Sequence, residues 1–376
     1  MEGRRDEMID LLRRLTLAES PSDRPDTHPR VQSILARELA KAGCHVRRVP
    51  GGRYGDHLLA RPRDLVQGGP TQLLIGHYDT VWPVGTVEAM PFREKDGRVT
   101  GPGVYDMKGG LVLIIFALRA LRDLGIEPPV TPLVFMNSDE EIGSPSSTPH
   151  IERLARTADR ALVLEPAQGP TGNIKTARKG VGHFRVRIRG VAAHAGVERE
   201  KGASAVLELA HVVQRLHALN DPERGITVNV GVISGGHRSN VVASESVANV
   251  DLRAYHETEA LEIREAVLAL QPVTPGVRIS LEDWEFRQAL ERTPRNRALW
   301  EATRRTGSLL GLNLEETAVG GGSDGNTTSL YTATIDGLGP RGGGSHAEYE
   351  HVVADSLPER GALLALLLLL PPIQAG

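Results

Sequence analysis

Hydrophobic positions follow two different spacings along the first 178 residues. Apolar residues three and four positions apart predict helices, whereas short unbroken apolar runs beside Gly, Pro or polar residues predict buried strands. The expected helices are 7–17, 31–42, 108–124 and 148–156, and the expected strands are 45–49, 73–77, 131–136 and 161–164. Strands that alternate with helices of this size predict an α/β fold, in which helices flank a mostly parallel sheet.

The spacing changes at His183. Phe184, Val186 and Ile188 alternate with three arginines, which indicates a strand with one buried and one solvated face. The later elements of this segment are expected at 203–219 (helix), 226–233 and 247–255 (strands), 257–270 (helix) and 277–282 (strand). The order strand, helix, strand, strand, helix, strand predicts a ferredoxin-like α+β sandwich.

The α/β spacing returns after position 292. The elements expected there are a helix at 298–310, Gly-rich loops at 320–326 and 337–345, a short strand at 333–336 and a final helix. A chain of 376 residues also exceeds what one core usually fills. We therefore predict that one domain is inserted into another: 1–178 and 292–376 form the outer domain, and 179–291 form the inserted one.

Composition narrows the range of partners. Forty-four basic and 47 acidic residues give a net charge of −3, which offers no overall attraction to nucleic acid or to an anionic membrane. We expect neither partner. The N-terminal residues lack the continuous apolar run of an export signal, and the longest apolar stretch, 362–370, is under half a membrane span. A cytoplasmic protein is expected.

Cys44 is the only cysteine in the chain. An intrachain disulfide and a cysteine-based zinc finger are therefore excluded. Any site for a transition metal must use His, Asp and Glu side chains.

Such side chains follow three of the predicted strands directly. In an open α/β sheet, ligands collect outside the carboxyl ends of the strands, so residues far apart in the sequence can converge there. The residues placed in this way are His77, Asp79, Asp139, Glu140, Glu141 and Glu165. Their chemistry predicts a metal site at this edge of the sheet.

Each of these segments also has an ordinary structural explanation. His77 and Asp79 lie on the same side of an extended chain, where Asp79 could orient the imidazole toward a metal or simply hydrogen-bond to it. The acidic run from Asp139 to Glu141 could be a solvated loop. Adjacent carboxylates repel unless a cation neutralises them, however, and a metal site would let one acid bind while its neighbour moves protons.

Two further candidates lie in Gly-rich loops. Asp106, in the segment 101–110, could bind a metal or cap the helix that follows it. This loop lacks the glycine spacings of nucleotide-binding motifs, so a nucleotide site is disfavoured. His346 follows three glycines, which is typical both of a close approach to a ligand and of an ordinary loop.

Taken together, these segments resemble the dinuclear zinc exopeptidase and aminoacylase family, and among its members the bacterial folate-cleaving glutamate carboxypeptidases. The motifs that carry the resemblance are 76–81, 101–110, 139–144, 165–166, 194–196 and 346–348, which follow one another in the family's order. The resemblance implies a zinc-exopeptidase-type sheet. It also implies that the inserted domain serves for dimerisation and as a lid.

The same resemblance implies a site for two zinc ions, although Co²⁺ or Mn²⁺ could use the same ligands. Asp106 would bridge the ions, His77 and Glu141 would complete one site, and Glu165 and His346 would complete the other. Met107 stands where relatives often have a second acid. The resemblance further implies that the peptide bond between Asp106 and Met107 is cis.

Catalytic and substrate-binding roles are also implied by the resemblance. Glu140 would be the general base, Asp79 would orient His77, and His194 would reach the active site of a second subunit, so that a homodimer is expected. The residues that would bind a substrate carboxylate are Asn240, Arg253 and Arg178. Arg253 could instead pair with acids near Asp251.

The predicted function is that of a metal-dependent exopeptidase or amidohydrolase. A hydroxide bridged by two metal ions would cleave the amide bond that holds a C-terminal amino acid, with glutamate as the expected product. An aminoacylase, a desuccinylase or a dipeptidase of the same family is the alternative. A non-catalytic relative that binds a metabolite is the alternative from another class.

Overall fold

The computed structural model describes residues 1–63 and 68–372. The chain divides into two compact units. The larger unit contains Met1–Thr176, Arg292–Ala318 and Ser323–Gly376, and the inserted unit contains Ala177–Glu291 and Val319–Gly322. Each unit is described by itself below.

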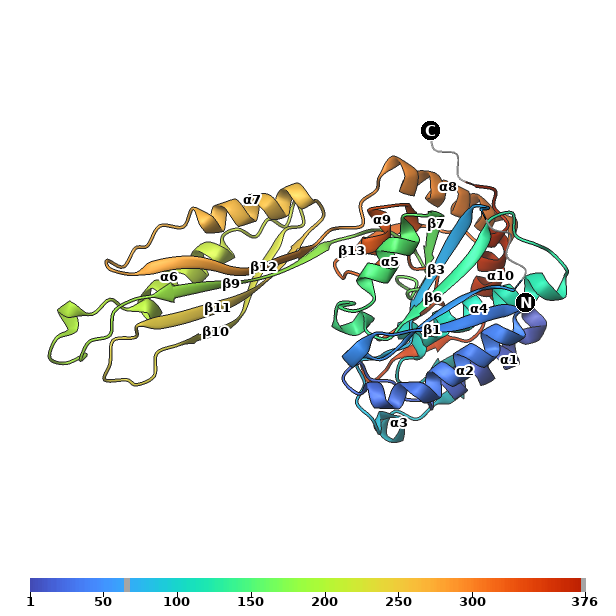
Figure 1. The fold of residues 1–376 in the computed structure, drawn as a ribbon, viewed down its shortest axis with the longest axis horizontal. Coiled ribbons are helices and arrows are strands. Elements are labelled where there is room, and N and C mark those ends of the chain that lie inside the picture. Colours follow the sequence, from blue (N-terminus) through green and yellow to red (C-terminus); the bar gives the residue numbers. More distant parts are fainter. Residues whose placement is uncertain (64–67, 373–376) are drawn as a thin grey trace. The chain divides into compact units, whose positions relative to one another are not determined.

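A six-stranded sheet forms the centre of the larger unit (Figure 1). Its strands, in spatial order, are β1 (Cys44–Val49), β2 (His57–Pro62), β6 (Thr131–Asn137), β3 (Thr71–His77), β7 (Ala158–Val163) and β14 (Ala333–Ile335). The last four run parallel, whereas β1 and β2 form an antiparallel edge. The mostly parallel sheet is therefore confirmed, and β2 is a strand that the spacing did not predict.

Helices cover both faces of this sheet. Neighbouring residues of β3 show this directly, because Leu74 belongs to one hydrophobic cluster and Leu73 and Ile75 belong to another. The larger cluster includes residues of α1 (Arg5–Thr16), α2 (His28–Lys41), α4 (Gly109–Asp123), α8 (Pro294–Leu309) and α10 (Ser356–Leu368). The smaller cluster includes residues of α5 (Thr148–Ala155).

A second, small sheet connects distant parts of the larger unit. Its order is β15 (Gly342–Gly343), β16 (His351–Val353), β5 (Arg98–Thr100) and β4 (Arg93–Lys95). Val352 of β16 lies opposite Val99 of β5. This pairing brings the Gly-rich loop near residue 345 beside the segment that precedes α4.

The inserted unit is a ferredoxin-like sandwich, as predicted. Its elements are β9 (Gly180–Arg189), α6 (Ala205–His217), β10 (Thr227–Gly235), β11 (Glu245–Ala254), α7 (Glu257–Leu268) and β12 (Arg278–Arg287). The antiparallel sheet has the order β10, β11, β9, β12. Phe184, Val186 and Ile188 are buried in the core of this unit. Strand β10 forms an edge of the sheet and exposes Val232 and Ile233.

The loop expected at 320–326 is shorter than predicted, because helix α9 (Asp324–Ser329) begins inside it. Ser323 caps this helix by accepting the Gly325 N–H at 3.0 Å, and Asn326 Oδ1 in turn accepts the Ser323 N–H at 3.0 Å. A reciprocal cap of this kind allows a helix to start directly after a run of glycines.

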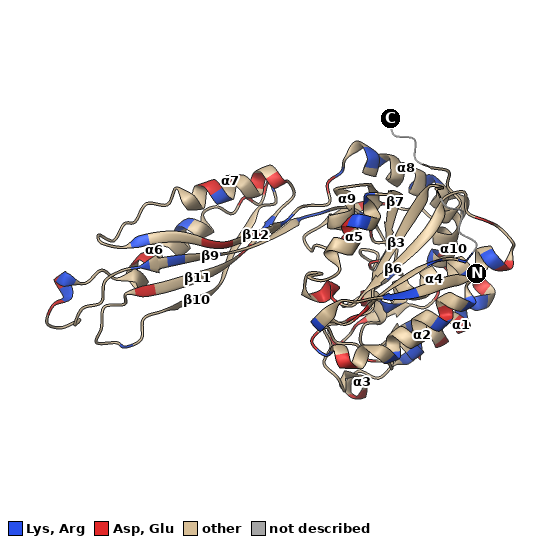
Figure 2. Cartoon of the chain, in the orientation of Figure 1, with Lys and Arg blue, Asp and Glu red and all other residues tan. Residues whose placement is uncertain are grey.

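Acidic and basic residues are interspersed along α1, α2 and α7 (Figure 2). This distribution agrees with the net charge of −3. Within the described residues, no helix is long and apolar enough to cross a membrane.

Candidate metal centre

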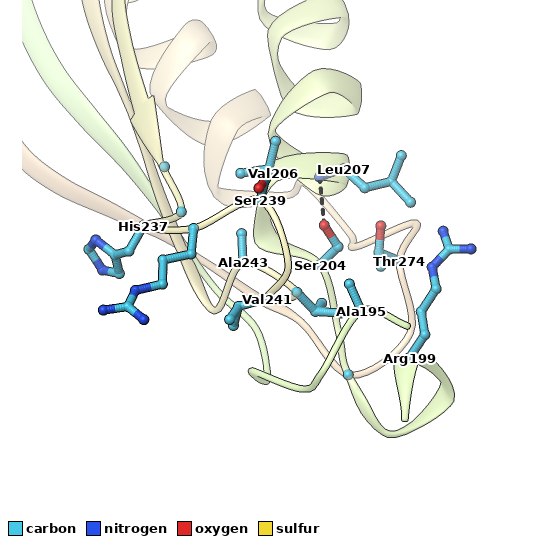
Figure 3. A pocket seen from close by; sticks show the side chains of 15 residues that line it. Ala195, Arg199, Ser204, Val206, Leu207, His237, Ser239, Val241, Ala243 and Thr274 are labelled. Atoms are coloured by element: carbon cyan, nitrogen blue, oxygen red, sulfur yellow. Dashed lines mark hydrogen bonds between the residues drawn. The ribbon is translucent and has the colours of Figure 1, made fainter. Parts of the chain in front are cut away.

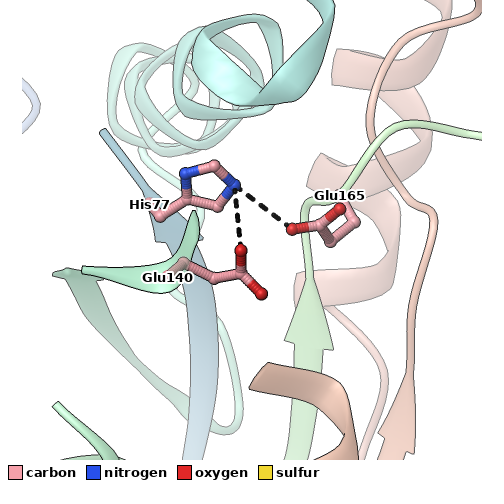
Figure 4. A group of neighbouring side chains, drawn as sticks. All are labelled: His77, Glu140 and Glu165. Carbon is pink, nitrogen blue, oxygen red and sulfur yellow. Dashed lines mark ion pairs between the residues drawn. The ribbon is translucent and has the colours of Figure 1, made fainter. Parts of the chain in front are cut away.

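Two of the predicted ligands, His77 and Glu165, and the predicted base Glu140 meet at the carboxyl ends of adjacent parallel strands. His77 ends β3, Glu140 lies in the turn after β6, and Glu165 follows β7. In Figure 4 the three side chains point toward one another. His77 Nε2 lies 3.4 Å from Glu165 Oε1 and 3.9 Å from Glu140 Oε2. Strand order β6, β3, β7 therefore places these residues side by side, as the sequence predicted.

Asp106 and His346 reach the same place from loops. Asp106 lies in the irregular turn Val104–Lys108 before α4, and its peptide bond to Met107 is cis, as expected. His346 adopts a positive φ of 61° in the loop between β15 and β16. His346 Nε2 lies 3.6 Å from Asp106 Oδ2 and 3.1 Å from Glu141 Oε2.

The two carboxylate oxygens of Asp106 face different imidazoles. Oδ1 lies 3.4 Å from His77 Nε2, and Oδ2 lies 3.6 Å from His346 Nε2. The shortest contacts of the two remaining acids place Glu165 with His77 and Glu141 with His346. Ligand atoms of His77, Asp106 and Glu141 also lie within 4.8 Å of one another. The shortest contacts thus pair the acids differently from the expected ligand sets, which joined Glu141 to His77 and Glu165 to His346 and which stay a prediction.

The donor atoms of this cluster fit a transition metal. Among the described residues, His77 Nε2 and Glu141 Oε1 are buried side-chain atoms without a hydrogen-bond partner. His77 Nδ1 lies 3.0 Å from the carbonyl oxygen of Asp79, a contact that fixes the ring and leaves Nε2 facing the carboxylates. Nitrogen and oxygen donors without sulfur suit Zn²⁺, and they also suit Co²⁺ or Mn²⁺.

Burial and crowded negative charge change the pKa values of two acids in the cluster. Burial raises the pKa of Glu140 well above its usual value, and Glu165 adds to the rise, although His77 opposes it. Burial likewise raises the pKa of Glu141 to about 7, although its hydrogen bond with His346 opposes the rise. Both acids are thus driven toward protonation unless positive charge enters the cluster.

Asp79 connects the His77 strand to the acidic turn. The side chain is fully buried, and its two oxygens accept the backbone N–H groups of Glu140 and Glu141, each at 3.2 Å. Ser22 Oγ donates a third hydrogen bond, at 2.7 Å. Burial opposes ionisation of Asp79, but the contact with His77 outweighs it, so the pKa of Asp79 is lowered. Sequence reasoning identified Asp79 and missed Ser22.

Asp139, the remaining acid of the run 139–141, makes different contacts. Its buried carboxylate accepts hydrogen bonds from the hydroxyl groups of Ser146 and Ser147, each at 2.6 Å. Asp139 thus closes the turn and is not a member of the cluster.

Asp324 holds the same turn from α9 by accepting from Ser144 Oγ at 2.6 Å and from Asn137 Nδ2 at 2.8 Å. Nothing in the spacing of the sequence identified Asp324.

His194 and Asn240 are neighbours in the inserted unit. Both side chains are exposed, and the Ala195 N–H donates to the Asn240 carbonyl oxygen at 3.0 Å. A pocket of about 650 Å³ lies beside these two segments and is lined by Ala195 and Val241, among others (Figure 3). The roles expected for His194 and Asn240 remain predictions.

The two arginines expected to bind substrate have partners within the inserted unit. Arg253 forms a bidentate contact with Asp251, with Nε 2.9 Å from Oδ1 and Nη2 2.9 Å from Oδ2. Buried Arg178 donates from Nη1 to the carbonyl oxygens of Gly321 and Gly322, at 3.1 and 3.2 Å. To bind a substrate carboxylate, Arg253 would have to give up its contact with Asp251 or contact both carboxylates at once.

The chain is similar to known hydrolases over most of its length. The family model described as Peptidase family M20/M25/M40 matches residues 73–370. Carboxypeptidase G2 from Pseudomonas sp. (strain RS-16) is 29% identical over 348 residues, which cover 90% of this chain and 82% of that protein. Acetylornithine deacetylase from Myxococcus xanthus is 32% identical over 181 residues, which cover 45% of this chain and 46% of the relative.

A solved structure shows the same fold. Aminopeptidase PepT from Bacillus cereus ATCC 10987 has a TM-score of 0.79 at 21% identity, with 97% of this chain and 98% of that chain covered. At this identity the similarity concerns the fold alone.

Binding of cations should stabilise the protein, because the carboxylates of Asp106, Glu141 and Glu165 repel one another without them. We expect calorimetry to show a thermal midpoint about 5 °C or more higher with Zn²⁺ than with EDTA.

Asp106→Asn provides the matched variant for this measurement. In EDTA it should unfold at a temperature no higher than the wild type, because burial opposes ionisation of Asp106 but the contacts with His77 and His346 outweigh it and lower the pKa of Asp106. It should also gain little from added Zn²⁺, because the shared ligand is weakened. Equal midpoints for the wild type in Zn²⁺ and in EDTA would contradict a metal centre at this place.

Proposed function

This chain belongs to peptidase family M20/M25/M40 and is a metal-dependent hydrolase; from that premise we propose that it is a carboxypeptidase that releases a C-terminal glutamate from peptidyl or N-acyl substrates. The observation that carries the proposal is the arrangement around Asp106, in which each oxygen faces one imidazole and each imidazole has one further acid beside it. Glu140 is left over as a candidate base. The choice of glutamate rests on the resemblance of the motifs.

We assign two metal ions, most simply Zn²⁺, to the two sides of Asp106. His77 and Glu165 would hold one ion together with Asp106 Oδ1, and His346 and Glu141 would hold the other together with Oδ2. Two divalent ions supply a polarised amide carbonyl and a water of lowered pKa. The chain itself supplies the ligands, their orientation and the groups that move protons.

Glu140 is suited to proton transfer because of its position in the acidic turn. Its carboxylate is 3.9 Å from His77 Nε2, which is farther than the carboxylates of Asp106 and Glu165. Burial raises its pKa well above the usual value. A base with a raised pKa can accept a proton from the attacking water and return it to the leaving amide nitrogen. A relative without catalytic activity would have no use for such an acid.

The identity of the released amino acid can be tested with a panel of amides. We expect the Zn²⁺-loaded protein to release glutamate from N-benzoyl-glutamate with a kcat/KM at least about tenfold higher than for N-benzoyl-alanine, a factor that corresponds to one charge-assisted contact. Amino acid analysis of the products gives the measurement. Faster cleavage of N-acetylornithine would contradict the proposal and indicate a deacetylase. Removal of the first residue of a tripeptide would contradict it and indicate an aminopeptidase.

The role of Glu140 can be separated from metal binding. Glu140→Gln should keep the metal content of the wild type, since Glu140 is not among the assigned ligands. It should lower kcat by at least about a hundredfold, because the water and the leaving nitrogen lose their proton carrier. Glu152→Gln, a change of the same kind on α5, should leave kcat unchanged. An unchanged kcat for Glu140→Gln would remove this residue from the mechanism.

We also propose that the protein forms a homodimer through the inserted unit. Strand β10 is an edge strand, and the side chains of Val232 and Ile233 on it are 58% and 59% exposed. An exposed apolar edge strand of this kind is a template for pairing with another chain. His194 would then donate a hydrogen bond to the developing oxyanion in the active site of the neighbouring subunit.

Disruption of this edge should separate the subunits. Ile233→Lys should yield a monomer in analytical ultracentrifugation, since it places a charge on the edge that must be buried. Leu261→Lys, an equivalent change on α7, should stay dimeric. His194→Ala should remain a dimer but lose kcat by about a hundredfold, as expected for loss of an oxyanion donor. Full activity of the Ile233→Lys monomer would contradict a shared active site.

A further inference from the structure

Glu350 is a buried acid that the chemistry above does not use. Its side chain is fully buried. Both oxygens accept two hydrogen bonds: Oε1 accepts from the N–H groups of Tyr105 and Asp106, at 2.8 and 3.0 Å, and Oε2 accepts from the Gly103 N–H and Trp82 Nε1, at 2.9 and 2.8 Å. One carboxylate thus gathers four donors, three of which come from the turn that carries Asp106.

Only a carboxylate can satisfy this set of donors. A glutamine of the same shape offers one oxygen and one NH₂ group, so either orientation of the amide would set its NH₂ against two N–H donors. Backbone N–H groups that converge in this way form an anion-binding nest, and here the anion is a side chain of the protein itself. Burial raises the pKa of Glu350, and the donated hydrogen bonds oppose this rise.

The backbone of the turn is shaped for this contact. Gly103 has a φ of 71°, and a Cβ added there would lie 2.6 Å from a side-chain carbon of Thr80. A residue with a side chain therefore fits poorly at this position. The positive φ helps to turn the N–H groups of residues 103, 105 and 106 toward the same point.

Glu350 joins three segments that carry proposed ligands. Trp82 lies five residues after His77, the turn from Gly103 contains Asp106, and Glu350 itself lies four residues after His346. Strand β16 begins directly after Glu350 and pairs with β5, which fixes this end of the loop. A displacement of Glu350 would therefore move Asp106 relative to both imidazoles.

We infer that Glu350 is a positioning residue that holds the backbone of Asp106, and thereby sets how its two oxygens face His77 and His346. The inference rests on the proposed role of Asp106 as the ligand shared by two metal ions. It extends that role to a residue that touches neither metal nor substrate. Glu350 acts through the N–H group of Asp106, at 3.0 Å.

A buried acid could also serve stability alone, and Glu38 provides the comparison. Its side chain is 1% exposed and lies 3.2 Å from both Arg14 Nη1 and Lys41 Nζ, on helix α2. Glu38→Gln should lower the thermal midpoint and leave metal binding unchanged. Glu350→Gln should lower the midpoint as well, but it should also change the metal centre.

The test measures Co²⁺ and Zn²⁺ binding to full-length wild type, Glu350→Gln and Glu38→Gln. We expect Glu350→Gln to weaken Zn²⁺ binding by about 10- to 100-fold in a chelator competition and to alter the visible absorption of bound Co²⁺. Its kcat should fall more than its KM rises, because the shared ligand is displaced. Glu38→Gln should match the wild type in affinity and spectrum.

Two outcomes separate this inference from the proposed function. If the wild type binds two Co²⁺ ions and Glu350→Gln binds them with the same affinity and spectrum, Glu350 is structural only. If the wild type binds no metal at this cluster, the proposed function fails first. Should Glu350→Gln not fold, Trp82→Phe removes one donor and keeps the carboxylate. It should shift the Co²⁺ spectrum in a smaller way, and an unchanged spectrum would overturn the inference.

Discussion

Repulsion among buried carboxylates is the constraint on which the rest of the structure depends. Asp106, Glu140, Glu141 and Glu165 lie around two imidazoles at the end of one sheet. Burial raises the pKa of Glu140 and Glu141, and the negative charge of neighbouring carboxylates adds to the rise. The cluster persists only if protons or cations neutralise it and if the surrounding backbone cannot relax. A metal centre meets the first condition, and the scaffold around it meets the second.

That scaffold is made of acids as well. Asp79, Asp139 and Glu350 are fully buried, and each accepts hydrogen bonds from the turns that carry the ligands. Hydrogen bonds to an ionised acceptor are stronger than neutral ones, so a buried carboxylate is an effective clamp for a turn. The structure therefore uses two sets of acids, one for the site and one for its support. The two sets are interleaved along the chain. Asp139 of the supporting set, for example, directly precedes Glu140 of the site.

The sequence pattern predicted the acids of the site but not most of the acids that support it. His77, Glu140 and Glu165 each follow a strand, and adjacent parallel strands bring their carboxyl ends together, so their convergence could be predicted. Glu350 and Asp324 act on partners 244 and 180 residues away. No periodicity links such pairs. The pairing of Glu141 with His346 was also beyond prediction, because it depends on which way two side chains turn. Strand β2 was not predicted either, although both of its neighbours in the sheet, β1 and β6, were.

The symmetry of the donor set supports the separate role that we propose for Glu140. Asp106 offers one oxygen to each imidazole, and each imidazole has one further acid close by, Glu165 or Glu141. Each imidazole thus has two carboxylate groups beside it, a combination of nitrogen and oxygen donors that suits a divalent cation. Binding of Glu140 as well would add further negative charge to a cluster in which each imidazole already has two carboxylates beside it. In the proposed mechanism Glu140 therefore remains available to exchange a proton, and Asp79 holds it next to the cluster by accepting its backbone N–H.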